Sequence, residues 1–413
     1  MSNGLLINAS GVVTCAGNLP QSDAGVVADA ALAWTDGRIE WIGPVSQLPQ
    51  QFAGYPRIDA EGLLVVPGLV DCHTHLAFGG WRADEFAERA RGVSYLEIAR
   101  RGGGIMCTVR QTREATEEEL LEHARTYMNR MLSVGVTTIE CKSGYGLTVD
   151  DELKLLRVYD SLRKSGPARI VATCLGAHVV PVEYRDDRSA YVEILRDDLI
   201  PRVADAGLAA YFDVFVEEGA FTADEARSIL ETASRFGLRA KLHVDQLHDM
   251  NGGALAAELD AVSADHLEYV SDPGIAAMEA AGVVPVALPL ASLYLRQTPL
   301  NARRFLDREI SVAVATDFNP GSAPSYHLPL AMTLACTMNG MTPAEALVGA
   351  TRIAARAIEM DRLVGSLEPE KRADFILVDT PTVDQWVYLF EPNKVKATYI
   401  DGNQVWSTSS GDS

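Results

Sequence analysis

The chain has 413 residues, of which 47% are hydrophobic and 22% charged, so it can bury a large globular core. Its formal net charge of −20 argues against a nucleic-acid partner, because phosphate binding needs clustered Lys and Arg. No stretch reaches the ~18 apolar residues of a membrane span. The first residues lack the pattern of a signal peptide, and the six cysteines form no CxxC pair, so we expect a cytoplasmic protein with reduced thiols and no membrane partner.

Short apolar runs with turn signals open the chain. They predict strands at Leu5–Ile7, Gly11–Thr14, Ala31–Thr35, Arg38–Ile42 and Leu63–Val66, with Asp36-Gly37 as a hairpin turn.

The middle of the chain alternates short β-rich runs with longer helical patterns, which favours a parallel α/β fold. The expected strands are Leu69–Leu76, Val136–Lys142, Arg169–His178, Tyr211–Val216, Leu238–Val244, Ala261–Leu267, Val283–Leu288 and Ile310–Asp317. The helix candidates between them include Glu117–Leu132, Asp151–Ser165, Ala223–Phe236, Gly252–Glu258 and Asp272–Ala281. Eight βα units in ~300 residues fit a closed barrel better than an open sheet.

The end of the chain returns to short strands. They are expected at Phe375–Val378, Val395–Ile400 and Gln404–Trp406, with a turn at Asp401-Gly402. Neither end is large enough to form a β-domain alone, so the two ends are expected to share one. The expected fold class is α/β: a TIM-type (β/α)8 metallohydrolase barrel over residues 67–365, with a small β-sandwich built from residues 1–66 and 366–413.

Histidines gather at the predicted strand ends. His73 and His75 are two apart on a strand, so they point to the same side. Active sites of barrels lie at the carboxyl ends of the strands, so residues from five strands should meet in one pocket. These residues are His73, His75, His178, His243, His266 and Asp317.

Three imidazoles and a carboxylate suit Zn²⁺ or Fe²⁺ better than Mg²⁺ or Ca²⁺, which prefer oxygen ligands. A metal so held lowers the pKa of a bound water toward neutrality and so makes a hydroxide nucleophile. Asp317 could both bind the metal and accept the proton of the water. His266 could hydrogen-bond to the hydroxide or to the oxyanion.

Other residues have a simpler interpretation. His123 lies in a strongly charged helix and is expected to be exposed, and His248 is expected in a surface loop. His327 is expected to have a structural role, and Cys72 to be a small buried filler.

The segment Pro67-Gly68-Leu69-Val70-Asp71-Cys72-His73-Thr74-His75 resembles the amidohydrolase superfamily. Longer stretches resemble those members that open the imidazolone ring in histidine degradation. They are Leu76-Ala77-Phe78-Gly79-Gly80-Trp81-Arg82, residues 92–104 with Ser94-Tyr95, Glu140-Cys141-Lys142-Ser143-Gly144-Tyr145-Gly146-Leu147, Leu175-Gly176-Ala177-His178, Ser263-Ala264-Asp265-His266-Leu267-Glu268 and Thr316-Asp317-Phe318-Asn319-Pro320-Gly321.

The resemblance implies hydrolysis of the cyclic amide of 4-imidazolone-5-propanoate to N-formimidoyl-L-glutamate, by attack of a metal-bound hydroxide. It implies one Zn or Fe ion (Fe²⁺ or Fe³⁺) per subunit, and a homodimer. The implied metal ligands are His73, His75, His243 and Asp317. The implied substrate contacts are Arg82, Tyr95, Tyr145, His178, Gln246, Asn319, Gly321 and Ser322. An arginine beside the metal suits the propionate tail, because its planar fork of donors fits a carboxylate.

Some positions depart from the pattern of the family. Gln246 stands where related deaminases have Glu, and an amide cannot shuttle a proton. Leu290 and Phe318 replace a usual Gly and Ser, and we expect both near the rim of the pocket. No lysine ends the fourth strand, which favours one metal over two, and Glu217 and Glu218 there are expected to begin a helix or to lie in a solvated loop.

Three alternatives stay open. The protein could act on another cyclic amide, it could be a metal-dependent deaminase, or it could be a non-catalytic member. Gln246 disfavours the second alternative. The third predicts a missing ligand, yet all four ligand positions are filled.

Overall fold

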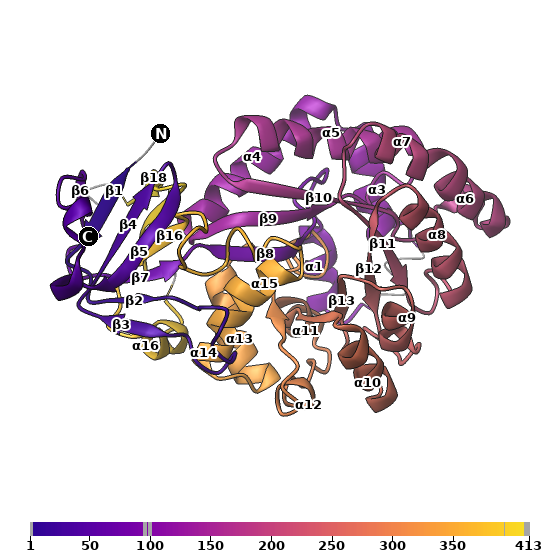
Figure 1. The fold of residues 1–413 in the computed structure, drawn as a ribbon. Helices are drawn as coiled ribbons and strands as arrows, with labels where there is room; N and C mark the ends of the chain where they lie inside the picture. The colour runs from indigo at the N-terminus through magenta and orange to yellow at the C-terminus, as the bar shows by residue number, and fades with distance from the viewer. Residues whose placement is uncertain (1–2, 94–96, 98–100, 392, 409–413) are drawn as a thin grey trace.

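The computed structural model describes residues 3–93, 97, 101–391 and 393–408. Eight parallel strands form its central sheet, in the order β15-β14-β13-β12-β11-β10-β9-β8 (Figure 1). Each strand pairs in parallel with the next along the chain, which is the topology of a (β/α)8 barrel. The strands are β8 (Leu69–Thr74), β9 (Val136–Lys142), β10 (Arg169–Ala177), β11 (Tyr211–Val216), β12 (Arg239–Val244), β13 (Ser263–His266), β14 (Val284–Ala287) and β15 (Ala313–Val314).

The barrel closes just beyond the end of β15. The amide of Asp317 donates to the carbonyl of His73 at 3.0 Å, and the amide of His75 donates to the carbonyl of Phe318 at 2.8 Å. The buried Asp71 carboxylate also accepts from the amide and hydroxyl of Thr316, at 3.1 and 2.6 Å. These bonds join the first strand to the segment after the last, so the seam fixes Asp317 beside His73 and His75.

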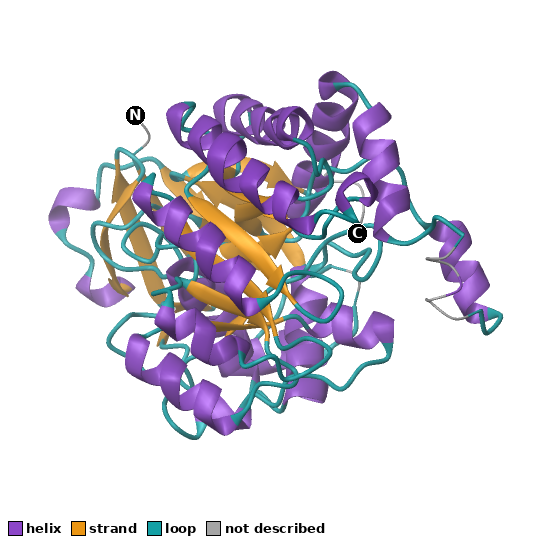
Figure 2. Cartoon of the chain, turned by 90° about the vertical axis from the view of Figure 1, so that its right-hand side faces the viewer, coloured by secondary structure: helices purple, strands orange, loops and turns teal. Residues whose placement is uncertain are grey.

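Helices surround the barrel strands (Figure 2). Three of them, α4, α8 and α14, begin with a capping box in which a Thr and a Glu satisfy free backbone amides. The helices are α1 (Ala83–Ala90), α3 (Ile105–Glu114), α4 (Glu117–Ser133), α5 (Val149–Ser165), α6 (Arg188–Ile194), α7 (Ile200–Asp205), α8 (Ala223–Arg235), α9 (Gly252–Glu258), α10 (Asp272–Ala281), α11 (Pro289–Leu295), α12 (Arg303–Leu306), α13 (Leu328–Asn339), α14 (Pro343–Val348), α15 (Ala354–Arg356) and α16 (Val383–Tyr388). Among the described residues, no helix is both long and apolar enough to cross a membrane.

Two smaller sheets lie at one end of the barrel, and the larger of them combines strands from both ends of the chain (Figure 1). One has the order β5-β4-β1-β6, and the other has the order β18-β17-β16-β7-β2-β3. Their strands are β1 (Gly4–Ile7), β2 (Gly11–Val13), β3 (Val26–Ala28), β4 (Ala30–Thr35), β5 (Arg38–Pro44), β6 (Arg57–Asp59), β7 (Leu64–Pro67), β16 (Phe375–Val378), β17 (Val395–Ile400) and β18 (Asn403–Ser407).

The two terminal sheets share a core of their own, in which Leu6, Trp34 and Phe375 pack together. Strand β16 pairs antiparallel with β7, so a C-terminal strand adjoins the strand that leads into the barrel. Both predicted hairpin turns have left-handed backbone, with φ of 52° and 74° at Asp36-Gly37 and of 51° and 70° at Asp401-Gly402. The expected fold class is confirmed. Strands β3 and β6 had no prediction, and β15 is much shorter than the predicted Ile310–Asp317.

Candidate active site

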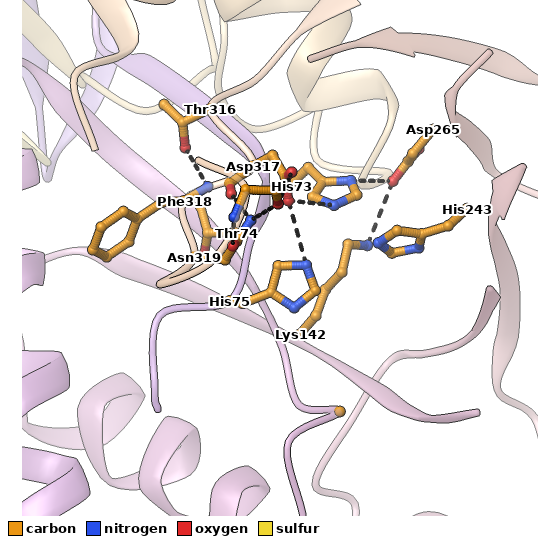
Figure 3. Close-up of polar contacts among 12 residues, drawn as sticks. His73, Thr74, His75, Lys142, His243, Asp265, Thr316, Asp317, Phe318 and Asn319 are labelled. Atoms are coloured by element: carbon orange, nitrogen blue, oxygen red, sulfur yellow. Dashed lines mark hydrogen bonds and ion pairs between the residues drawn. The ribbon is translucent and has the colours of Figure 1, made fainter. Parts of the chain in front are cut away.

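Of the predicted strand-end histidines, His73, His75 and His243 point toward one another (Figure 3). The Asp317 Oδ1 atom lies 3.4 Å from His73 Nε2 and 3.5 Å from His75 Nε2. The rings of His243 and His266 approach that of His73, with centroids 4.5 and 5.8 Å apart. All five side chains are almost completely buried.

This cluster could hold a metal ion. The ligand atoms of His73, His75 and Asp317 lie within 4.8 Å of one another, and so do those of His73, His243 and His266. Both His73 Nε2 and His243 Nε2 are buried without a hydrogen-bond partner, as expected of atoms that face an ion. Imidazole nitrogens with one carboxylate suit Zn or Fe.

The protonation states of His75, His243 and Asp317 also suit a metal. Burial holds the pKa of His243 well below its usual range and lowers that of His75, so both imidazoles are neutral at pH 7. For Asp317, burial raises the pKa, but His73 and His75 outweigh it and hold the pKa well below its usual range. Neutral imidazoles and an ionised carboxylate are the forms that bind metals. Burial and Lys142 lower the pKa of His73, but Asp265 and Asp317 outweigh them and raise it to about 9, so a metal must displace one proton from this ring.

Two aspartates that the sequence analysis did not assign stand behind the histidines. Asp265 Oδ2 lies 2.6 Å from His73 Nδ1, and Asp213 Oδ1 lies 3.0 Å from His243 Nδ1. Because a carboxylate accepts, each Nδ1 carries the proton and leaves Nε2 free for the ion. Acidic residues inside otherwise apolar strands were the sequence signal that could have revealed them.

The segment after β15 forms a turn held by Asn319. The Oδ1 atom of Asn319 accepts from the amides of Gly321 and Ser322, at 2.8 and 2.7 Å, and its Nδ2 donates to the Asp317 carbonyl at 2.7 Å. The Arg82 guanidinium lies directly over Gly321, where an added Cβ atom would overlap Nη2. The Nε of Arg82 is buried without a partner, so this cation keeps a donor for a ligand.

Tyr145 and His178 lie on the other side of the histidines. The His178 ring stacks on that of His75, with centroids 5.5 Å apart, and Tyr145 lies 5.6 Å from the His75 ring. Burial and the neighbouring His75 lower the pKa of His178 to about 3, so its ring is neutral. Its Nδ1 donates to the Gly144 carbonyl at 3.0 Å, which leaves Nε2 as a hydrogen-bond acceptor.

The loop that carries Tyr145 wraps around a buried carboxylate. Glu152 accepts from the amides of Gly144, Gly146 and Leu147, at 2.9, 2.8 and 2.7 Å, and is fully buried. Since Gly144 also orients His178, Glu152 fixes two of the predicted substrate contacts at once.

The variant Glu152→Gln tests this anchor. An amide would place an N–H group against at least one of the three backbone donors, so the free energy of unfolding should fall by about 1–3 kcal/mol. We also expect KM to rise, because Tyr145 and His178 lose their fixed support. Denaturant unfolding and steady-state kinetics measure both effects. The control is Glu119→Gln, whose carboxylate accepts one backbone amide, that of Thr116, in the exposed capping box of α4. Wild-type values for Glu152→Gln would contradict the prediction.

Gln246 faces the site from the loop after β12. Glu217 anchors this loop: its buried carboxylate accepts from the amide of Leu247 at 2.8 Å, and His248 Nδ1 lies 2.9 Å from it. The expectation that Glu217 is solvated is therefore wrong, because backbone donors 30 residues away enclose it. His248 is 58% exposed, as predicted.

The predicted residues line a cavity of about 420 Å³. Those found on its wall are His75, Arg82, Tyr145, His178, His243, Gln246, His266, Asp317, Asn319, Gly321 and Ser322. His73 lies beneath them, and Tyr95 falls outside the described residues. The cavity wall also includes Glu85, Arg89, Phe215, Leu295 and Gln297, for which the sequence analysis made no prediction.

Phe318 and Leu290 were expected near the rim of the pocket. Both side chains are buried and do not line the cavity. Phe318 instead packs against Tyr127, with ring centroids 5.0 Å apart, in a cluster of aromatic rings outside the barrel wall.

His123 was expected to be exposed, but it belongs to the same aromatic cluster. Its ring lies 4.5 Å from that of Phe78 and both ring nitrogens are buried, so it is not exposed. His327 caps α13 through Nδ1, in line with its predicted structural role, and Cys72 is fully buried.

A histidine and aspartate cluster at the strand ends of a barrel is the arrangement of a metal-dependent hydrolase. The model of the amidohydrolase family matches residues 64–405. The chain is 44% identical over 388 residues to the imidazolonepropionase of Geobacillus kaustophilus, covering 93% of this chain and 91% of the relative. It is 46% identical over 387 residues to that of Symbiobacterium thermophilum, covering 92% and 91%. The chain therefore belongs to the amidohydrolase family and, within it, to the imidazolonepropionases.

Solved structures share the fold at much lower identity. The guanine deaminase of E. coli superposes with a TM-score of 0.72 at 16% identity, covering 99% of this chain and 100% of that one. The 5-methylcytosine deaminase of Klebsiella pneumoniae gives a TM-score of 0.73 at 17% identity, covering 98% of each chain. This likeness concerns the fold alone.

Proposed function

We propose that this enzyme hydrolyses the cyclic amide of 4-imidazolone-5-propanoate to N-formimidoyl-L-glutamate, a step of histidine degradation. The observation that carries the proposal is the cavity in which His75, His243 and Asp317 face Arg82. It joins a candidate metal site to a cation suited to a carboxylate tail, as this substrate requires.

In this proposal His73, His75, His243 and Asp317 hold one Zn or Fe ion. Such an ion supplies a water whose pKa is lowered toward neutrality. Asp317 accepts the proton of that water, and its Oδ2 receives support from the Ser322 hydroxyl at 3.4 Å. His266 stabilises the oxyanion that forms when the carbonyl carbon becomes tetrahedral.

The remaining cavity residues bind and orient the substrate. Arg82 pairs with the propionate through its planar fork of donors, beside the turn of Asn319, Gly321 and Ser322. His178 accepts a hydrogen bond from an N–H group of the substrate ring through its free Nε2, and Tyr145 packs against the substrate. Tyr95 is added as a substrate contact by family resemblance alone. Gln246 donates or accepts a hydrogen bond but carries no titratable proton, so Asp317 returns the proton to the leaving ring nitrogen.

The chain is divided, in this proposal, into a catalytic barrel at residues 67–365 and a composite β-sandwich at residues 1–66 and 366–413. We further infer a cytoplasmic homodimer, from the family resemblance. Light scattering on the purified protein tests the dimer, and cell fractionation tests the location.

The test is turnover of freshly made imidazolonepropionate, with the product identified by mass. The assay compares the purified enzyme, the chelated enzyme, and the chelated enzyme resupplied with Zn or Fe. We expect N-formimidoyl-glutamate to form only with metal. Ammonia release would instead indicate a deaminase, and bound metal without turnover would reject the substrate while retaining the site.

A further inference from the structure

A cluster of charged side chains lies inside the barrel next to the histidines, and Figure 3 shows Lys142 reaching Asp265. Lys142, Asp213 and Asp265 come from β9, β11 and β13, and all three are fully buried. Alternate strands of a barrel supply the side chains of one interior layer, so these three residues meet at one level. Such layers are normally apolar, and burying charges costs free energy unless they are paired.

Lys142 is the group that the carboxylates share. Its Nζ lies 2.8 Å from Asp213 Oδ2, 2.9 Å from Glu140 Oε1 and 3.5 Å from Asp265 Oδ2. The second buried lysine of the barrel, Lys241, donates to the carbonyl of Ala357 at 3.0 Å, and its charge also acts on Asp265.

Each aspartate also contacts a histidine of the metal site, and Asp265 Oδ1 accepts from the Ser263 hydroxyl at 2.7 Å. Asp265 Oδ2 meets both Lys142 and His73 Nδ1, whereas Asp213 meets Lys142 with Oδ2 and His243 Nδ1 with Oδ1. One ammonium group thereby connects two histidines that stand on strands β8 and β12.

We propose that Lys142 is a positioning residue for the metal site, which holds Asp213 and Asp265 so that both histidines present Nε2 to the same ion. This inference rests on the proposed ligand set. Without the ammonium group, three carboxylates would crowd a space that excludes water, and rotation of a side chain would relieve their repulsion. A displaced aspartate no longer fixes the Nδ1–H form and the orientation of its histidine.

The test measures metal binding rather than turnover. Metal-free protein is titrated with Co²⁺ against a competing chelator, and the visible absorption of bound Co²⁺ reports the geometry of the ligands. Loss of such supporting contacts typically costs about 10–100-fold in metal affinity. We expect Lys142→Met to bind Co²⁺ about 10–100-fold more weakly, with shifted absorption bands.

Three further variants separate positioning from stability. The double variant Lys142→Gln with Glu140→Gln keeps the buried net charge unchanged. This protein should therefore fold even where Lys142→Met does not, and its Co²⁺ binding should still weaken. Glu140→Gln alone should bind normally, since Glu140 contacts no histidine. Arg169→Met removes a cation shared by Asp374 and Asp401, at 3.0 and 2.6 Å, at the opposite end of the barrel. It should lose stability yet keep the affinity and spectrum.

The outcomes are distinct. Affinities within twofold of wild type and an unchanged spectrum, in either Lys142 variant, would overturn the role of Lys142. A wild-type protein that binds no Co²⁺ would overturn the proposed ligand set itself, and this inference with it.

Discussion

Asp317→Asn is expected to lower kcat by about 10²–10⁴-fold even when the protein is fully loaded with metal. The asparagine keeps the size of the side chain but cannot accept a proton from water. The aspartate it replaces is held ionised by His73 and His75, which keep its pKa well below the usual range against the opposing effect of burial. Steady-state kinetics at saturating substrate, together with metal analysis of the same sample, measures the effect.

The metal content decides how the result is interpreted. If Asp317→Asn lost its metal, lower turnover would report ligation alone, so kcat is compared per bound ion. Ser322→Ala serves as the control, because it removes only the hydroxyl that lies 3.4 Å from Asp317 Oδ2 and should change kcat less than tenfold. A metal-loaded Asp317→Asn enzyme with more than a tenth of wild-type kcat would contradict a role as proton acceptor.

Gly321→Ala is expected to raise KM by about 10–100-fold with little loss of stability, the magnitude of a lost hydrogen bond to a charged group. The added methyl group would occupy the position of Arg82 Nη2, so the guanidinium must leave the place where it meets the carboxylate. The glycine has no left-handed φ, so alanine fits the backbone there and the damage falls on Arg82. Kinetics on imidazolonepropionate and thermal unfolding measure the two quantities.

A double-mutant cycle sharpens this prediction. If Gly321→Ala acts through Arg82, then adding it to Arg82→Met should raise KM little further, because the guanidinium is already gone. Gly54→Ala is the control, since its added Cβ would meet nothing within 4 Å and its φ is also ordinary. Additive increases in KM would show that the methyl group acts on the cavity by another route.

The sequence by itself determined the barrel and the composition of the candidate site. Strands β9 and β11 begin and end at the predicted residues, because β-branched and aromatic residues dominate them and Gly135 and Gly219 lie close to their bounds. The histidines at strand ends followed from the same pattern, since every parallel strand of a barrel ends at the same face. The family resemblance added the substrate contacts, of which Arg82, Tyr145, His178 and Gln246 all line the cavity.

Only the tertiary structure showed what holds these residues in place. Lys142 and Asp213 are 71 residues apart in sequence, and His73 and Asp265 are 192 apart, so no local pattern links them. A lone charge in a strand is usually at the surface, and the free energy that keeps it buried comes from partners on other strands. For the same reason the sequence misplaced His123, Phe318 and Glu217, whose surroundings are built by segments that meet only when the barrel closes.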